Sequence, residues 1–272
     1  MTASTIATDR AAVGPSYGRF AGLGALIRKD TTEWLRGKRA WIVFTITTLF
    51  MVLAAANAWI NQLIINSLPP DVDPPDAPVS MAPLDNLVGA IGSQIFILAA
   101  IFAVASLIVR ERESGTLAWV ASKPVSRSSI WLAKWISSSA ILAVAAVFAP
   151  IAVTAAAVVV LYGAPDVVPV IVVAIGAAAV VAFYAALGLA AGTVMPGQPA
   201  IAATGFGVFA LVPIVASLIP FPVGPYLPTS ILEWSLATAG GVDAGWVTPV
   251  AWAVGTAALV GFALRRMGRM EL

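Results

Sequence analysis

The chain has 272 residues, of which 60% are hydrophobic and only 10% are charged, and its mean hydropathy is +0.95. A soluble domain carries about a quarter charged residues to cover its surface, so this composition excludes a chain that faces water all round. With no histidine and no cysteine, the chain also lacks the commonest general base and metal ligand, and it has no disulfide or thiolate chemistry.

The first 39 residues divide into two parts. Residues 1–18 have no apolar core, so we expect a mobile tail there and not a signal peptide. In residues 19–39, apolar side chains recur at helical spacing and charged side chains occupy other faces: Phe20, Leu23, Ile27 and Trp34 against Arg28, Lys29, Glu33 and Arg36. This pattern is typical of an amphipathic helix in the membrane surface, with an ordinary basic flank of the next helix as the alternative.

Five long stretches of the chain contain no acidic or basic residue. They lie between Arg39 and Asp71, Asp85 and Arg110, Lys134 and Asp166, Asp166 and Glu233, and Asp243 and Arg265. A helix needs about 20 apolar residues to cross a bilayer's hydrocarbon, and the fourth stretch is long enough for two helices. We therefore predict an all-α, polytopic membrane protein with six spans in a transmembrane domain of residues 40–264. The spans are expected at residues 41–65, 86–109, 136–161, 168–194, 200–219 and 246–264.

Several amide side chains interrupt the first two predicted spans, and three of them are candidates for a functional role. Asn57 and Asn61 lie four residues apart, and so on one face of the first span, and Gln94 lies in the second. Such amides can line a substrate path, or they can form hydrogen bonds between helices, and the sequence leaves both possibilities open. The segment 67–83 between the two spans has six prolines, a density that favours an extended, solvated linker over a cation site.

Residues 110–134, RERESGTLAWVASKPVSRSSIWLAK, form the one substantial charged loop between predicted spans. Gly115 permits a sharp backbone turn, and residues 116–121 are long enough for a short helix that Pro124 would end. Ser126 or Ser128 can then cap the next helix. A short helix with an exposed apolar face suits docking of another protein, and the alternative is a loop anchored to lipid headgroups.

A proline-rich segment at residues 220–245 precedes the last predicted span. Its prolines prevent a simple continuation of the fifth span. Ser230 and Glu233 have the spacing of a capping box, and Gly240 can close a helix of about two turns. We predict a short re-entrant helix on the external side, in which Glu233 is mainly a cap and a substrate role is secondary.

Every basic residue falls in three segments that alternate across the predicted spans. The segment before the first span holds seven, the loop 110–134 holds five, and the tail 265–272 holds three. The three intervening segments hold only acids: Asp71, Asp73, Asp76, Asp85, Asp166, Glu233 and Asp243. Because short loops rich in Lys and Arg stay in the cytoplasm, we predict that both termini and the loop 110–134 are cytoplasmic.

Within that loop, Glu111, Arg112, Glu113, Gly115, Thr116, Leu117, Pro124, Val125, Ser126, Arg127 and Lys134 form a recognisable pattern. It resembles the cytoplasmic signature of the type-2 ABC exporter permeases, in which this region forms a coupling helix that sits on an ATPase subunit. The resemblance implies that coupling residues are Glu111, Arg112, Glu113, Gly115, Thr116, Leu117, Trp119, Val120, Pro124 and Arg127. Many members have an acid shortly after Thr-Leu, whereas Ala118 and Trp119 are apolar here.

The resemblance also covers the interface helix, the six spans and the re-entrant segment. It implies the permease subunit of an ATP-driven exporter in the cell membrane, with a cytoplasmic ABC ATPase and a second permease copy, identical or related, as partners. ATP and Mg would bind to the ATPase, and this chain would hold no cofactor or metal. Asn57, Asn61, Gln94 and Glu233 are then the candidates for the substrate path.

Apart from the resemblance, the sequence itself favours a transport subunit that has no ATP site of its own. No G-x-x-x-x-G-K-[ST] motif is present to hold ATP phosphates, and the predicted spans contain no ionisable group that could bind a coupling ion. Without histidine, the main intramembrane protease mechanisms fail, so we expect no enzyme. A net charge of +2 without a basic, aromatic surface excludes nucleic acid as a partner. A non-catalytic membrane scaffold is the remaining alternative.

Overall fold

The computed structural model describes residues 18, 20–69, 80–122, 125–195 and 197–269, and in these ranges the chain is helical without any strand. Apart from Gly18, the predicted tail 1–18 lies outside the described residues, as do most of the linker 67–83 and Pro124. The predicted tail after the last span is helical through residue 269.

Six helical segments of the described chain are long and apolar enough to cross a membrane, as predicted. They are α2 (Lys38–Asn66), α3 to α5 (Pro83–Glu113), α7 to α8 (Arg127–Tyr162), α9 (Val167–Gly192), α10 (Gln198–Leu218) and α12 (Val247–Arg269). Four of the segments extend beyond the predicted charge-free spans because charged residues at their ends are still helical, whereas α9 and α10 match their predicted spans to within two residues. The third begins at Arg127, well before the predicted start at residue 136, so the last part of the expected loop is helix.

Two of the spanning segments are interrupted. The second consists of α3 (Pro83–Gly92), α4 (Ile95–Ala105) and α5 (Leu107–Glu113), which meet at Gln94 and at Ser106. The third consists of α7 (Arg127–Leu142), the π-helical turn η1 (Ala143–Phe148) and α8 (Ala149–Tyr162). Pro150 follows that wide turn directly, and a wider turn accommodates a ring that would otherwise collide with the preceding helical turn.

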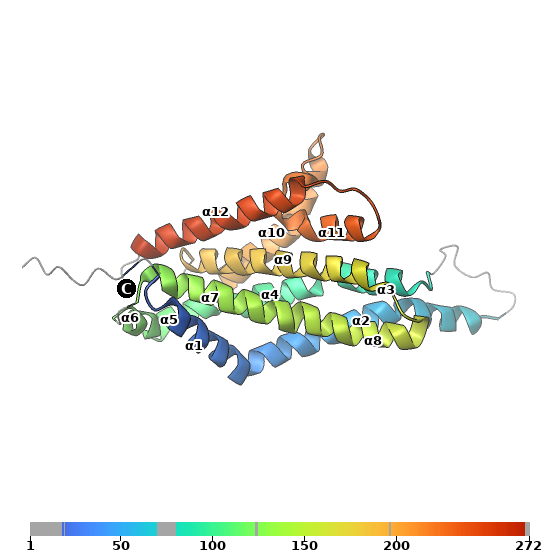
Figure 1. The fold of residues 1–272 in the computed structure, drawn as a ribbon, viewed down its shortest axis with the longest axis horizontal. Helices are drawn as coiled ribbons and strands as arrows, with labels where there is room; N and C mark the ends of the chain where they lie inside the picture. Colours follow the sequence, from blue (N-terminus) through green and yellow to red (C-terminus); the bar gives the residue numbers. More distant parts are fainter. Residues whose placement is uncertain (1–17, 19, 70–79, 123–124, 196, 270–272) are drawn as a thin grey trace, which may run out of the picture.

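The helix α9 forms the centre of the bundle, packed against α4, α7, α10, α11 and α12 (Figure 1). Glycines on its surface let the second segment approach closely. A Cβ at Gly188 would lie 3.2 Å from Val104, and a Cβ at Gly192 would lie 3.2 Å from Ile108. Val104 and Ile108, one helical turn apart, therefore pack against the two glycines of the G-x-x-x-G pair. Small residues promote helix packing in membranes in this way.

The bundle has two chemically different ends (Figure 1). The first, which we call the basic end, brings together α1 (Leu23–Arg36), α5, α6 (Thr116–Ala121) and the C-terminal end of α12. The opposite, acidic end contains α3, the N-terminus of α9 and α11 (Ile231–Ala239). The predicted N-terminal amphipathic helix is thus present as α1, and it lies against α7.

The helix α11 corresponds to the short helix predicted before the last span, and two 3-10 turns, η2 (Gly224–Tyr226) and η3 (Pro228–Ser230), precede it. It packs closely on α9, where a Cβ at Gly176 would overlap Ser235. The predicted capping box is wrong, because the Ser230 side chain makes no cap hydrogen bond. The 3-10 turn that ends at Ser230 gives this residue a ψ of 4°, far from the extended geometry of a capping residue.

Candidate functional site

A sharp elbow at the basic end consists of α5, a turn at Gly115 and α6. Gly115 has a φ of +70°, so the predicted glycine turn is confirmed. In α6, which begins with Thr116 and Leu117, the Trp119 side chain is 61% exposed, and Val120 is buried. The elbow thus presents an indole at the surface of the end that carries α1 and the C-terminal part of α12.

The chain that follows the elbow is attached to the start of α1. The backbone N–H of Ser126 donates to the carbonyl of Ala21 over 3.2 Å, and a Cβ at Gly22 would overlap Val125. The hydroxyl of Ser126 accepts a hydrogen bond from the Ser129 N–H at 3.0 Å, so the predicted cap of the third span is confirmed. The elbow, α1 and α7 are therefore joined through a few residues.

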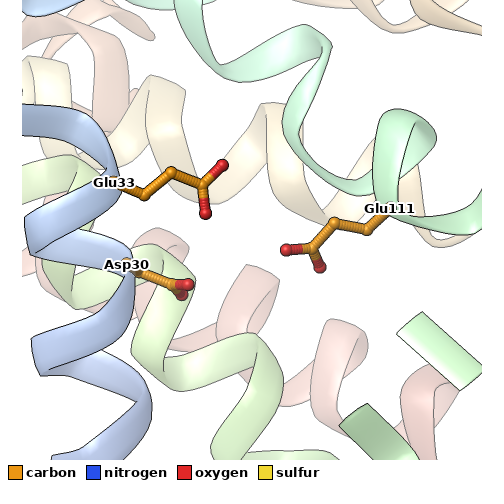
Figure 2. Close-up of side chains that lie close together, drawn as sticks. All are labelled: Asp30, Glu33 and Glu111. Carbon is orange, nitrogen blue, oxygen red and sulfur yellow. The ribbon is translucent and has the colours of Figure 1, made fainter. Parts of the chain in front are cut away.

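A cluster of five charged side chains fills the space between these three elements. In this charge cluster, Lys134 Nζ lies 2.7 Å from Glu111 Oε1 and 3.8 Å from Asp30 Oδ2. Lys29 Nζ lies 3.4 Å from Asp30, 3.6 Å from Glu111 and 3.9 Å from Glu33. Figure 2 shows the three carboxylates converging from α1 and α5. Because Lys134 is in α7, the cluster joins all three elements.

Burial determines how these groups behave. Asp30 and Lys134 are each only 7% exposed. Burial raises the pKa of Asp30 above its usual 3.8, although Lys134 and Lys29 act in the opposite direction. Burial would lower the pKa of Lys29, but Glu111, Asp30 and Glu33 together outweigh it and raise this pKa above 10.5.

Three carboxylates at such distances, with oxygens within 4.8 Å of one another, also have the composition of a cation site. The ammonium groups of Lys29 and Lys134 already lie among them. Two positive charges against three carboxylates leave little need for a metal ion, and we interpret the cluster as a buried ion-pair network.

The other predicted coupling residues lie around this network. The guanidinium of Arg112 donates to the Met195 carbonyl at 3.1 Å, which joins the elbow to the loop between α9 and α10. Arg127 donates to the Gly268 carbonyl at 3.4 Å, which joins the start of α7 to the end of α12. Glu113 is exposed. Of the predicted set, Glu111, Arg112 and Arg127 thus make contacts with other elements of the chain.

A second candidate site lies at the acidic end, where a cavity of about 810 Å³ opens between α4, α9, α10 and α11. Gln94 and Glu233, both predicted for a substrate path, line it together with Tyr184, Phe209 and Pro213. Gln94 has a φ of +58°, the one left-handed conformation of a non-glycine residue in the described ranges. Such a conformation costs about 1–3 kcal/mol and is common where structure serves function.

Asn57 and Asn61 do not reach this cavity. Asn57 is exposed and lines a separate groove with Phe50, Leu53 and Ser93, and Asn61 is half-buried on the same helix. In the parts of the chain that the structure describes, neither amide forms a hydrogen bond to another helix. The structure therefore separates the four predicted substrate-path residues into two groups.

The sequence interpretation missed Asp30 and Tyr184. Asp30 lies one helical turn from both Leu26 and Trp34, which are buried, so an acid on the apolar face of α1 was the signal. Tyr184 lies in a long apolar run, where no pattern distinguishes a cavity-lining residue from one in the core.

Comparison with known proteins agrees with this architecture. The family model described as ABC-2 family transporter protein matches residues 24–234, from the start of α1 into α11. No curated protein shows significant similarity to the chain.

Proposed function

The chain belongs to the ABC-2 transporter family and is a transmembrane permease subunit, and on this premise we propose that it serves an ATP-driven exporter powered by a separate cytoplasmic ATPase. In this proposal the basic end faces the cytoplasm and both termini lie there. The distribution of basic residues supports this orientation, because Lys and Arg are retained on the cytoplasmic side. The proposal also places the chain in the cell membrane.

The observation that carries the proposal is the elbow attached to α1 and α7 through buried ion pairs. A force on the exposed surface of α6 would reach the second segment directly through α5. It would reach the third segment through Lys134, which is only 2.7 Å from Glu111. The exposed indole of Trp119 gives a partner an aromatic anchor of the kind that is enriched at protein interfaces. ATP and Mg would bind to the partner.

We further propose that the acidic-end cavity is part of the substrate path. Its aromatic and aliphatic lining, with one amide at Gln94 and one carboxylate at Glu233, suits an amphipathic cargo better than a highly charged one. A second permease copy, identical or related, would complete the pathway. The exposed apolar surface of α10, including Phe206, Leu211 and Leu218, suits either that copy or lipid.

The partner is tested by purifying the complex and measuring ATP turnover. Gly115→Val introduces a β-branched residue at a positive φ, and Gly241→Val does the same at the acidic end, where φ is +80°. We expect Gly115→Val to lose ATPase association and coupled turnover while Gly241→Val keeps association. If the unmodified chain retains no ATPase, or if both variants lose it equally, the proposal is wrong.

The orientation is tested by labelling, since the chain has no cysteine of its own. Ser114→Cys at the elbow and Asp243→Cys at the acidic end introduce single thiols at exposed positions. In intact cells, a membrane-impermeant maleimide should label the cysteine at 243 and leave that at 114 unmodified. The reverse pattern would place the elbow outside and remove the basis for coupling.

A further inference from the structure

Two arginines at the basic end lack the partners that the lysines of the charge cluster have. Arg39 lies in the first turn of α2, and Arg110 lies in α5. They are close enough to repel each other, and Glu33 is the nearest acid that acts on Arg39. In the described parts of the chain, neither guanidinium forms an ion pair.

Both arginines line a cavity of about 550 Å³, together with Lys29, Lys134 and Ser106. Its acids, Asp30, Glu33 and Glu111, are those that already pair with the two lysines. The cavity wall therefore has two neighbouring guanidiniums, and its four cationic side chains exceed its three acidic ones, which leaves one net positive charge. Paired arginines at a membrane interface bind phosphate oxygens well, because the planar guanidinium donates in a fork.

An apolar groove begins where this cavity ends. It has a volume of about 530 Å³, lies between α2 and α4, and shares Arg39 and Ser106 with the cavity. The remaining lining is apolar: Ile42, Val43 and Ile46 from α2, and Ile95, Leu98, Ala99, Phe102 and Ala103 from α4. Several of these side chains are largely uncovered, with Ile42 54% and Phe102 59% exposed.

We propose that these two spaces together bind one anionic phospholipid, its phosphate between Arg39 and Arg110 and an acyl chain in the groove between α2 and α4. The groove accommodates hydrocarbon, and the arginines select negative charge where basic pockets between spanning helices bind acidic headgroups. Exposed Arg36 and Lys38 nearby add attraction for an anionic surface. Because Arg110 is in α5, the bound lipid would join the first segment to the elbow.

The test measures binding of dioleoyl phosphatidylglycerol and of phosphatidylcholine to the purified full chain by native mass spectrometry. Arg39→Gln/Arg110→Gln should weaken binding of the anionic lipid about thirtyfold, since each interfacial cation contributes about fivefold. Binding of phosphatidylcholine should change little. The matched control Arg265→Gln/Arg266→Gln removes two exposed charges from the same end outside both spaces, and should bind the anionic lipid as the unmodified chain does.

Two further measurements separate the contribution of the lipid headgroup from that of its acyl chain. Ala99→Leu fills the groove and should weaken binding of both lipids while leaving the arginines in place. Inorganic phosphate should displace the lipid poorly, because it has no chain to bury. Arg39→Lys/Arg110→Lys keeps the charge and should retain part of the preference for the anionic lipid. The retained binding of phosphatidylcholine shows that Arg39→Gln/Arg110→Gln folds.

Three outcomes would overturn the proposal. The first is unchanged binding of phosphatidylglycerol by Arg39→Gln/Arg110→Gln, and the second is an equal loss in Arg265→Gln/Arg266→Gln. The third is efficient displacement by inorganic phosphate, which would make this a simple anion site. The result is independent of ATPase association, so failure here leaves the proposed transport role untouched.

Discussion

The two ends of the bundle are held together by different forces. At the basic end, three ion pairs connect α1, α5 and α7, and two more lie within α1. At the acidic end, the described residues form no ion pair. Among these residues, Asp85 and Asp243 accept hydrogen bonds only from residues close to them in the chain, and the following contacts are between neutral groups. The Tyr162 hydroxyl donates to the Ala55 carbonyl and accepts from the Trp59 N–H, each at 2.8 Å. The indole of Trp234 donates to the Gly245 carbonyl at 2.6 Å.

This difference indicates how much each end can rearrange. Removing one member of a buried ion-pair network leaves an uncompensated charge, whereas a neutral hydrogen bond contributes only about 1 kcal/mol to stability. We expect the basic end to move as one body and the acidic end, with its cavity and its strained Gln94, to change shape more readily.

The largest effect is expected from Lys134→Met. It removes the cation nearest to Glu111 and the buried cation that pairs with Asp30, and loss of one partner from such a network costs about 3–5 kcal/mol. Lys29→Met is the matched control, because the Lys29 side chain is 43% exposed and solvent screens its pairs. Thermal unfolding in detergent should show a much lower Tm for Lys134→Met than for Lys29→Met. Equal shifts would mean that burial does not distinguish the two lysines.

The next effect concerns the packing of α11 on α9. Gly176→Ala places a Cβ against Ser235, and overpacking of this kind costs about 1–3 kcal/mol. Gly207→Ala in α10 has no heavy atom near its new Cβ and gains helix propensity. The Tm should fall for Gly176→Ala and stay level or rise for Gly207→Ala. Ser235→Gly should restore part of the loss in the double variant, and failure to do so would contradict this contact.

A smaller effect is expected from Tyr162→Phe. Its hydroxyl bridges a carbonyl and an N–H that are four residues apart in α2, which is the spacing of a helical hydrogen bond. Once the hydroxyl is removed, α2 can close that bond itself, so the net loss should be about 1 kcal/mol or less. A Tm decrease as large as that of Lys134→Met would show that the acidic end is held as firmly as the basic end.

The six spanning segments could be predicted from the sequence because charged side chains are costly in the lipid hydrocarbon and are therefore absent from long apolar stretches. Four of the predicted spans were too short because their helices continue through charged interfacial residues. Ser126, recognised as a possible cap, marked the true start of the third segment. The turn at Gly115 was predictable because few residues other than glycine adopt a positive φ.

The charge cluster and the cavity were less predictable. Asp30 was visible as an acid at helical spacing from Leu26 and Trp34, and Lys134 as a cation between Ala133 and Trp135. Nothing in one sequence shows that two such residues far apart in the chain meet. The left-handed conformation of Gln94 and its position near Glu233 depend on how α4, α9 and α11 pack. The capping-box prediction for Ser230 and Glu233 failed because the spacing of the two residues did not reveal the 3-10 turn that precedes α11.

The smallest expected effect is a difference between the two ends in how the Tm depends on pH. Since burial raises the pKa of Asp30 above 3.8, the folded state binds this proton more tightly than the unfolded state. The resulting stabilisation is fully present below pH 3.8 and is lost as pH rises through the folded-state pKa. Asp30→Asn has no carboxyl group at this position and so lacks this pH-dependent stabilisation. The Tm of the unmodified chain, relative to that of Asp30→Asn, should therefore fall as the pH rises from 3.8 through the folded-state pKa. Gly176→Ala, at the neutral end, should instead show a Tm difference from the unmodified chain that does not change with pH. If Gly176→Ala showed the same pH dependence, the electrostatic distinction between the ends would fail.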